Sequence, residues 1–94
     1  MKLSEADITK RMRAVRSWQR NSSEITRTFE FDNFAGSMKF ANAVAELAEK
    51  EDHHPDILVQ YNTVTLTLST HSEGGLTAKD FDLAEKIEKI TSKK

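Results

Sequence analysis

The sequence predicts an α+β fold in a single domain, residues 1–94, with the element order α-β-β-α-β-β-α. Three observations indicate it: helical spacing of apolar residues in three stretches, strand-like alternation in two pairs of stretches, and a length that suits one hydrophobic core. Two hairpins would form a four-stranded antiparallel sheet with the three helices on one face. The opposite face, rich in Thr, Ser and Glu, is left to solvent, a ligand or a partner.

Composition excludes several classes of protein. The net charge of −1 is not the basic footprint of a nucleic-acid-binding domain. No apolar run approaches the length of a membrane span, and the N-terminal residues lack the apolar core of a secretory signal. The absence of cysteine excludes disulfides, thiolate nucleophiles and cysteine-based zinc sites. We therefore expect a cytoplasmic protein that binds neither nucleic acid nor membranes.

The N-terminal third predicts a helix followed by a hairpin. Ser4 can cap a helix whose buried stripe has helical spacing: Ile8, Met12 and Val15. An extended segment opens at Trp18, a turn follows at 21–23, and residues 24–31 alternate. The apolar face of this second strand contains Ile25, Arg27, Phe29 and Phe31. Arg27 is out of place there, and it can either extend to the sheet margin or pair across a subunit boundary.

The central helix begins after a cap at Asp32 or Asn33 and extends to about Glu49. Its apolar residues form two neighbouring stripes that merge into one wide arc: Phe34, Met38, Ala41, Ala45 and Ala48, beside Phe40, Val44 and Leu47. A helix with so wide an apolar arc is expected to be central to the core.

The second hairpin begins after Pro55, which stops any helix. Its first strand, residues 56–61, carries on one face Ile57, Val59 and Tyr61, so packing is the expected job of Tyr61. A turn at 62–63 leads to a strand in which Val64, Leu66 and Leu68 alternate with Thr65, Thr67 and Ser69. Pairing about this turn would place residue 54 opposite His71, which leaves the sheet on its polar face.

The last helix follows a loop at 72–75. Thr77 and Asp80 start it in the manner of a capping box, and a first-turn acid is a sufficient role for Asp80. The expected staple and buried stripe are formed by Leu76, Phe81, Leu83, Ile87 and Ile90. Lys93 and Lys94 are expected to form a frayed, solvated end.

The three histidines carry the most unusual chemistry of the chain: His53 and His54 before the second hairpin and His71 after it. Imidazole can donate or accept a proton near neutrality, because its unperturbed pKa is roughly 6.5. Three interpretations compete. Adjacent histidines are commonly surface loop residues; a zinc site is disfavoured because neighbours on an extended chain point apart; and a metal-free acid–base site on one small substrate is possible.

A spaced pattern favours the third interpretation: Glu49, His53-His54-Pro55, Tyr61, His71 and Asp80. With this pattern the chain resembles the pterin-4a-carbinolamine dehydratase family over nearly its full length. Further family-like segments are Thr26-Arg-Thr-Phe-Glu-Phe, Val44-Ala-Glu-Leu-Ala-Glu, Leu68-Ser-Thr-His71 and Gly75-Leu-Thr-Ala-Lys-Asp80. One departure is Ser17, before Trp18, where the family usually has Gly; it affects a turn and not the site.

The resemblance implies a hydro-lyase that removes water from a 4a-hydroxytetrahydropterin without a metal or cofactor. The quinonoid dihydropterin so formed would return to the tetrahydropterin cycle of an aromatic amino acid hydroxylase. His53 and His71 would act as acid and base on the hydroxyl, while His54 would bind and orient the pterin. Glu49 would orient an imidazole or meet the amino-pyrimidine edge. The implied substrate-binding set is Glu49, Asp52, His53, His54, Pro55, Ser69, Thr70, His71 and Ser72.

The resemblance also implies a homodimer or homotetramer. Its main alternative is a non-catalytic interaction protein, since some animal members of the family serve as dimerisation cofactors of a homeodomain transcription factor. A second alternative is a protein of this fold recruited to molybdopterin metabolism or to the assembly of a larger enzyme. Such relatives tend to lose parts of the histidine pattern, which this chain retains in full.

Overall fold

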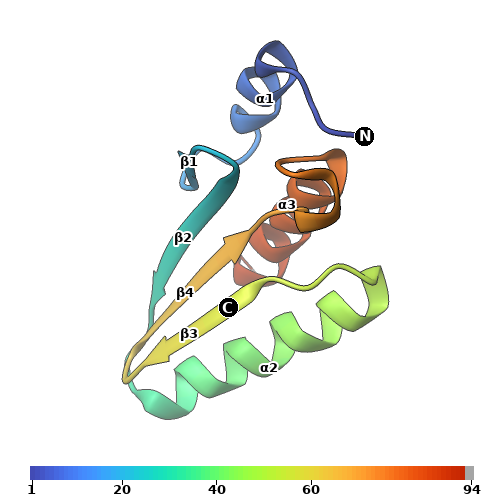
Figure 1. Ribbon diagram of the computed structural model, residues 1–94. Helices are drawn as coiled ribbons and strands as arrows, with labels where there is room; N and C mark the ends of the chain where they lie inside the picture. The colour runs from blue at the N-terminus through green and yellow to red at the C-terminus, as the bar shows by residue number, and fades with distance from the viewer. Residues whose placement is uncertain (93–94) are drawn as a thin grey trace.

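The computed structural model describes residues 1–92 and has the predicted α+β architecture (Figure 1). Its elements are α1 (Glu5–Met12), β1 (Gln19–Asn21), β2 (Glu24–Glu30), α2 (Phe34–Glu51), β3 (Asp56–Gln60), β4 (Thr63–Leu68), a 3₁₀ turn η1 (His71–Glu73) and α3 (Ala78–Ser92). The strands form one antiparallel sheet in the order β1-β2-β4-β3. The frayed end expected at Lys93-Lys94 lies outside the described residues. Within them, no helix is both long and apolar enough to cross a membrane.

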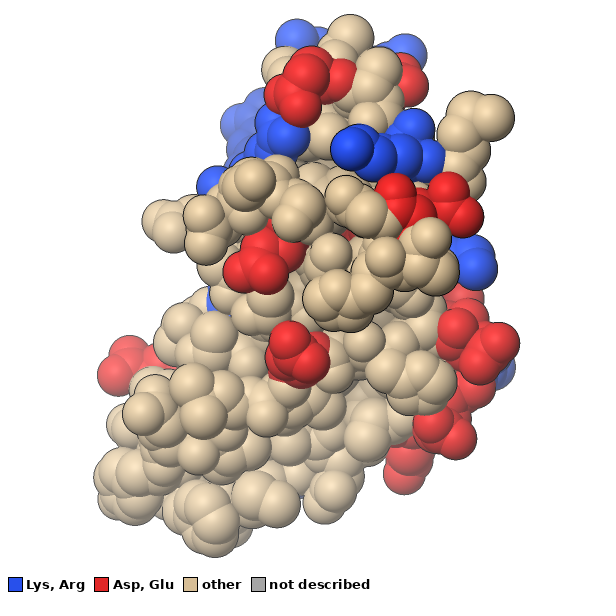
Figure 2. All heavy atoms as spheres, in the orientation of Figure 1, with Lys and Arg blue, Asp and Glu red and all other residues tan. Residues whose placement is uncertain are grey.

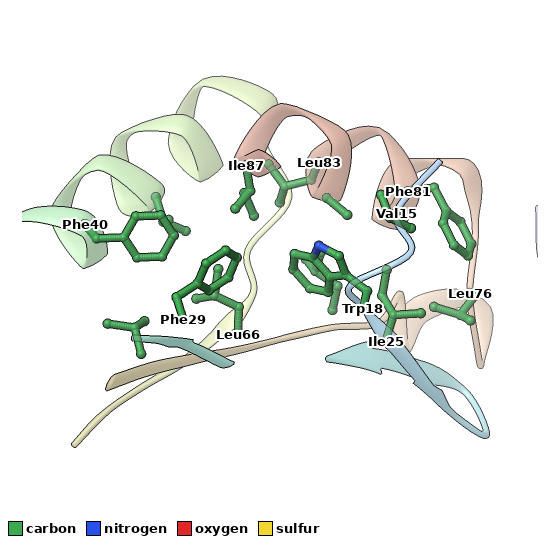
Figure 3. Close-up of a cluster of buried hydrophobic side chains, with 14 of the residues drawn as sticks. Val15, Trp18, Ile25, Phe29, Phe40, Leu66, Leu76, Phe81, Leu83 and Ile87 are labelled. Carbon is green, nitrogen blue, oxygen red and sulfur yellow. The ribbon is translucent and has the colours of Figure 1, made fainter. Parts of the chain in front are cut away.

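The core fills the layer between the sheet and helices α2 and α3 (Figure 3). The central strands β2 and β4 pair over six residues and turn Ile25, Phe29 and Leu66 toward the helices. The predicted stripe of α3 is confirmed, because Leu83 and Ile87 are fully buried. Side chains from both layers therefore interdigitate in one continuous cluster.

Trp18, expected only to open a strand, is part of this core and meets Phe29 edge to face with ring centroids 6.2 Å apart. Its indole N–H donates to Glu88 of α3 over 2.8 Å. Arg27 also pairs with Glu88, and its guanidinium lies 4.2 Å from the centre of the Phe29 ring. Arg27 thus has a partner within the chain, and of its two predicted alternatives the pairing across a subunit boundary is not needed to explain this residue.

Helix α1 joins the rest of the chain through its two ends. Ser4 caps it as predicted, accepting the N–H of Asp7 over 3.1 Å. At the other end, Arg11 pairs with Asp82 of α3 at 2.8 Å. Arg20 of β1 forms a bidentate ion pair with Glu5. The hydrogen bond from Arg20 lowers the pKa of this exposed carboxyl.

Only part of the predicted arc of α2 is buried. The helix begins after Asn33, whose side chain accepts the N–H of Gly36, and Val44 and Ala48 face the core. Phe34 and Met38 are exposed, although Ala41 and Ala48 of the same predicted stripe are buried. Figure 2 shows few charged side chains over the part of the surface where α2 begins and the β3–β4 turn lies in Figure 1.

The turn of the second hairpin lies one residue earlier than predicted. Strand β3 ends at Gln60, and the turn is formed by Tyr61 and Asn62 instead of residues 62–63. Tyr61 has a left-handed φ of 49° and is 67% exposed, so its predicted packing role is wrong. Asp56 pairs with Thr67, and the same register extended would place residue 54 opposite Ser69, not opposite His71.

Candidate active site

The candidate site lies where the segment after α2 meets the segment after β4. Helix α2 ends at a left-handed residue, Asp52, with φ 54°, whose backbone N–H returns to the last turn of the helix. The N–H of His53 also bonds back, to the carbonyl of Ala48 over 3.1 Å. Pro55 then prevents continuation of the helix and leads into β3. Asp52, predicted to edge the pocket, thus has a clear local role as the helix C-cap.

His53 is held by a fully buried carboxylate. Its Nε2 lies 2.6 Å from Oδ1 of Asp80, and the two side chains are 11% and 0% exposed. The other oxygen of Asp80, Oδ2, accepts the hydroxyl of Thr70 over 2.8 Å and the backbone N–H of Thr77 over 2.9 Å. The contact with Thr77 confirms the predicted capping box, but a helix-terminal role alone is an incomplete account of Asp80.

His54 has an exposed counterpart of this pair. Its Nε2 lies 2.6 Å from Oε2 of Glu49, with side chains that are 54% and 77% exposed. The expectation that Glu49 orients an imidazole agrees with this contact. Because water surrounds the pair, it holds His54 weakly and a ligand can displace it.

The other predicted residues follow β4. His71 lies in η1, is exposed, and makes no side-chain hydrogen bond within residues 1–92. Thr70 and Ser72 line a cavity of about 360 Å³ together with Met1, Glu73, Thr77, Ala78 and Lys79. Ser69 instead donates its hydroxyl to the carbonyl of Ser23 over 2.9 Å. The structure therefore brings Thr70 close to His53 through Asp80, while Ser69 is bonded toward the first hairpin.

Sequence reasoning did not connect Thr77 and Lys79 with this cavity, and it gave Asp80 only a helix-terminal role. The capping-box pattern placed Thr77 and Asp80 at the helix start, but such a box occupies only one oxygen of its acid. The unassigned oxygen was the available signal that this carboxylate could serve another residue. Lys79, directly before Asp80, contributes a cation to the cavity.

His53 and His54, each with its own carboxylate partner, and the exposed His71 supply three imidazoles that can exchange protons with one small molecule or bind it. The chemistry needs no metal ligand set, and no group of three or more His, Asp or Glu residues in the described part of the chain is arranged to hold a metal. Neither the cavity at Thr70 and Ser72 nor a further hollow, about 370 Å³ beside Phe31, Phe40 and Ile90, is lined by a histidine. The candidate site is therefore defined by the two histidine–carboxylate pairs that follow α2.

Comparisons with known proteins concern the chain as a whole. The family model described as pterin 4 alpha carbinolamine dehydratase matches residues 1–90. A relative from Sulfolobus acidocaldarius is 48% identical over 90 residues, which are 96% of this chain and 99% of the relative. One from Thermomicrobium roseum is 43% identical over 91 residues, 97% and 98% of the two chains. Both are provisionally named pterin-4-alpha-carbinolamine dehydratase.

Solved structures share the fold. A crystal structure from Brucella melitensis, described as a transcriptional coactivator/pterin dehydratase, has a TM-score of 0.90 and 39% identity, covering 96% of this chain and 98% of that one. A pterin dehydratase-like protein identified as a RuBisCO assembly factor in the alpha-carboxysome has a TM-score of 0.62 at 23% identity, a likeness of fold alone. The fold and the site define a small α+β protein of the pterin-dehydratase type. The chain belongs to the pterin 4 alpha carbinolamine dehydratase family.

Proposed function

We propose that this chain is a 4a-hydroxytetrahydrobiopterin dehydratase that works by metal-free acid–base catalysis. The observation that carries the proposal is the pair of neighbouring histidines, each 2.6 Å from a different carboxylate. His53 is paired in a dry environment and His54 in a wet one. In many active sites two side chains of the same type have different roles in one reaction because their surroundings differ.

The proposed reaction is an elimination of water. An imidazolium donates a proton to the C4a hydroxyl as the C4a–O bond breaks, since hydroxide itself is a poor leaving group. The N5 lone pair forms the C4a=N5 bond, and the N5 proton passes to a neutral imidazole. One proton is given and one is taken, so the reaction is balanced without a redox cofactor or a covalent nucleophile.

In this proposal His53 and His71 act on the departing hydroxyl, and His54 binds and orients the pterin. The cavity lined by Thr70 and Ser72, the two residues that flank His71 in the sequence, supports a binding role for the segment after β4. The product would return to the cofactor cycle of an aromatic amino acid hydroxylase. A cytoplasmic location and a homo-oligomeric state remain predictions.

The test is the dehydration of a chemically generated 4a-hydroxytetrahydropterin, measured by absorbance against the spontaneous rate. Changing His53 to Ala should lower turnover by roughly 10²–10⁴-fold if this imidazole transfers the proton. Gln60→Ala, an exposed change at the far end of β3, serves as the control and should leave turnover unchanged. An unaltered rate in His53→Ala would exclude the assigned role.

The same assay decides the alternative class of function. The relative described as a RuBisCO assembly factor is a named case of this fold in an assembly role. A pure interaction module would give no acceleration over the spontaneous reaction with the wild-type chain. That result would replace the dehydratase proposal with a binding role.

A further inference from the structure

Asp80 is a buried carboxylate whose two oxygens serve different partners. We propose that Asp80 is a positioning residue that fixes His53 as the Nε2–H tautomer, so that Nδ1 is the nitrogen available to the substrate. The catalytic consequence of this inference rests on the proposed function. The tautomer itself does not, and it can be measured separately.

The donors around Asp80 determine which way the proton lies. An aspartate carboxylate offers only acceptor sites. Its Oδ1 lies 2.6 Å from Nε2 of His53, so this nitrogen must carry the hydrogen and donate it. A neutral imidazole has one donor and one acceptor nitrogen. The acceptor of neutral His53 is therefore Nδ1.

A chain of hydroxyl groups keeps Asp80 in this orientation. Thr70 must donate to Oδ2 of Asp80, because the carboxylate can only accept, over 2.8 Å. Its oxygen then accepts from the hydroxyl of Thr77, also over 2.8 Å. Thr77 in turn accepts the backbone N–H of Lys79 over 3.3 Å. The hydrogens of the Lys79 backbone N–H, the Thr77 hydroxyl and the Thr70 hydroxyl therefore all point toward the carboxylate of Asp80. The two carboxylate oxygens cannot exchange places without breaking these hydrogen bonds.

The arrangement exceeds what a helix cap requires. The backbone N–H of Thr77 reaches only Oδ2, which would satisfy a capping box by itself. Oδ1 is directed instead at a residue 27 positions earlier, on the segment after α2. The exposed pair of Glu49 and His54 has no comparable set of buried donors and competes with water. Of the two pairs, only His53–Asp80 is built to hold one tautomer.

The decisive variant is Asp80→Asn, which keeps the shape of the side chain. Its amide oxygen can still accept from Thr70 and Thr77, which turns the amide NH₂ toward Nε2 of His53. That nitrogen must then accept, and His53 is forced into the Nδ1–H tautomer, the wrong form for the proposed reaction. We expect turnover to fall roughly 10²–10⁴-fold while KM changes by less than about threefold, since Asp80 does not touch the substrate.

The ¹⁵N chemical shifts of the His53 ring report the tautomer directly. Wild-type protein should show Nε2–H, and Asp80→Asn should show Nδ1–H. Asp7→Asn, the same change at an exposed aspartate of α1, is the matched control, and both the Nε2–H tautomer and the turnover should remain. A folded Asp80→Asn protein with unchanged turnover would overturn the positioning role.

Two further outcomes are decided by the same measurements. If Asp80→Asn does not fold, the wild-type spectrum still decides, because Nδ1–H there would refute the inference. If the wild-type protein accelerates no dehydration, the proposed function fails while the His53 tautomer still tests the geometric assignment. The two failures are therefore distinguishable.

Discussion

His53 and His54 are adjacent in the chain yet occupy opposite environments. Neighbouring side chains on an extended backbone point to opposite sides, so one imidazole turns toward α3 and the other toward water. The inward ring meets a carboxylate that is shielded from solvent, whereas the outward ring meets one that is mostly solvated. The contrast supports assigning chemistry to His53 and ligand binding to His54.

For the exposed carboxylate of this pair, we predict that Glu49→Gln has only a mild effect on stability and turnover. The exposed pair with His54 contributes little to folding, so the free energy of unfolding should fall by less than about 1 kcal/mol. If His54 orients the pterin, KM should rise more than turnover falls. Steady-state kinetics and urea denaturation measure both effects. Glu46→Gln, an exposed change on the same helix, is the control, and a loss of turnover as large as that of His53→Ala would contradict the division of roles.

At the level of helices and strands, some features of the fold and the site can be predicted from the local sequence and others cannot. Apolar spacing predicted the three helices because burial imposes a 3.6-residue period, and Ser4 and Asn33 cap two of them. The hairpin register was wrong because Tyr61 adopts a left-handed backbone that Gly or Asn would normally signal. The His53–Asp80 contact could not be predicted from local pattern, because it depends on how α2 and α3 meet across the sheet.

A polar contact between α3 and the first hairpin leads to a second prediction. Glu88 on α3 accepts from Arg27 on β2 and from Trp18, which directly precedes β1. Glu88→Ala would leave an indole N–H and a half-buried guanidinium without this acceptor, at a cost of about 1–3 kcal/mol in the free energy of unfolding. Guanidinium chloride denaturation measures it. Lys50→Ala, an exposed change on α2, should cost far less, and equal costs would show that Glu88 is not a structural link.

The whole molecule exposes apolar groups where its sheet also has a free edge. Within residues 1–92, strand β3 pairs with β4 alone, so its other edge carries backbone groups that pair with no strand of the described chain. Ile57 and Leu58 on this strand, and Phe34 and Met38 on α2, are exposed. Figure 2 shows few charges over this region. Monomeric proteins usually protect such an edge with charge, Pro or a covering element. We propose that copies of this chain cover it by forming the homodimer or homotetramer predicted from the sequence.

Leu58→Lys tests that proposal. A lysine in the middle of a free edge strand opposes edge-to-edge pairing, because two copies would bring like charges together and bury them. The wild-type protein should sediment as a dimer or tetramer at micromolar concentration, and Leu58→Lys should weaken the association by at least about tenfold.

Thr28→Lys, which adds the same charge to the exposed face of β2, should leave the association unchanged, since β2 is an inner strand. Dehydratase activity that survives in a monomeric Leu58→Lys variant would show that each chain carries its own complete site. A monomeric wild-type protein would refute the proposed interface.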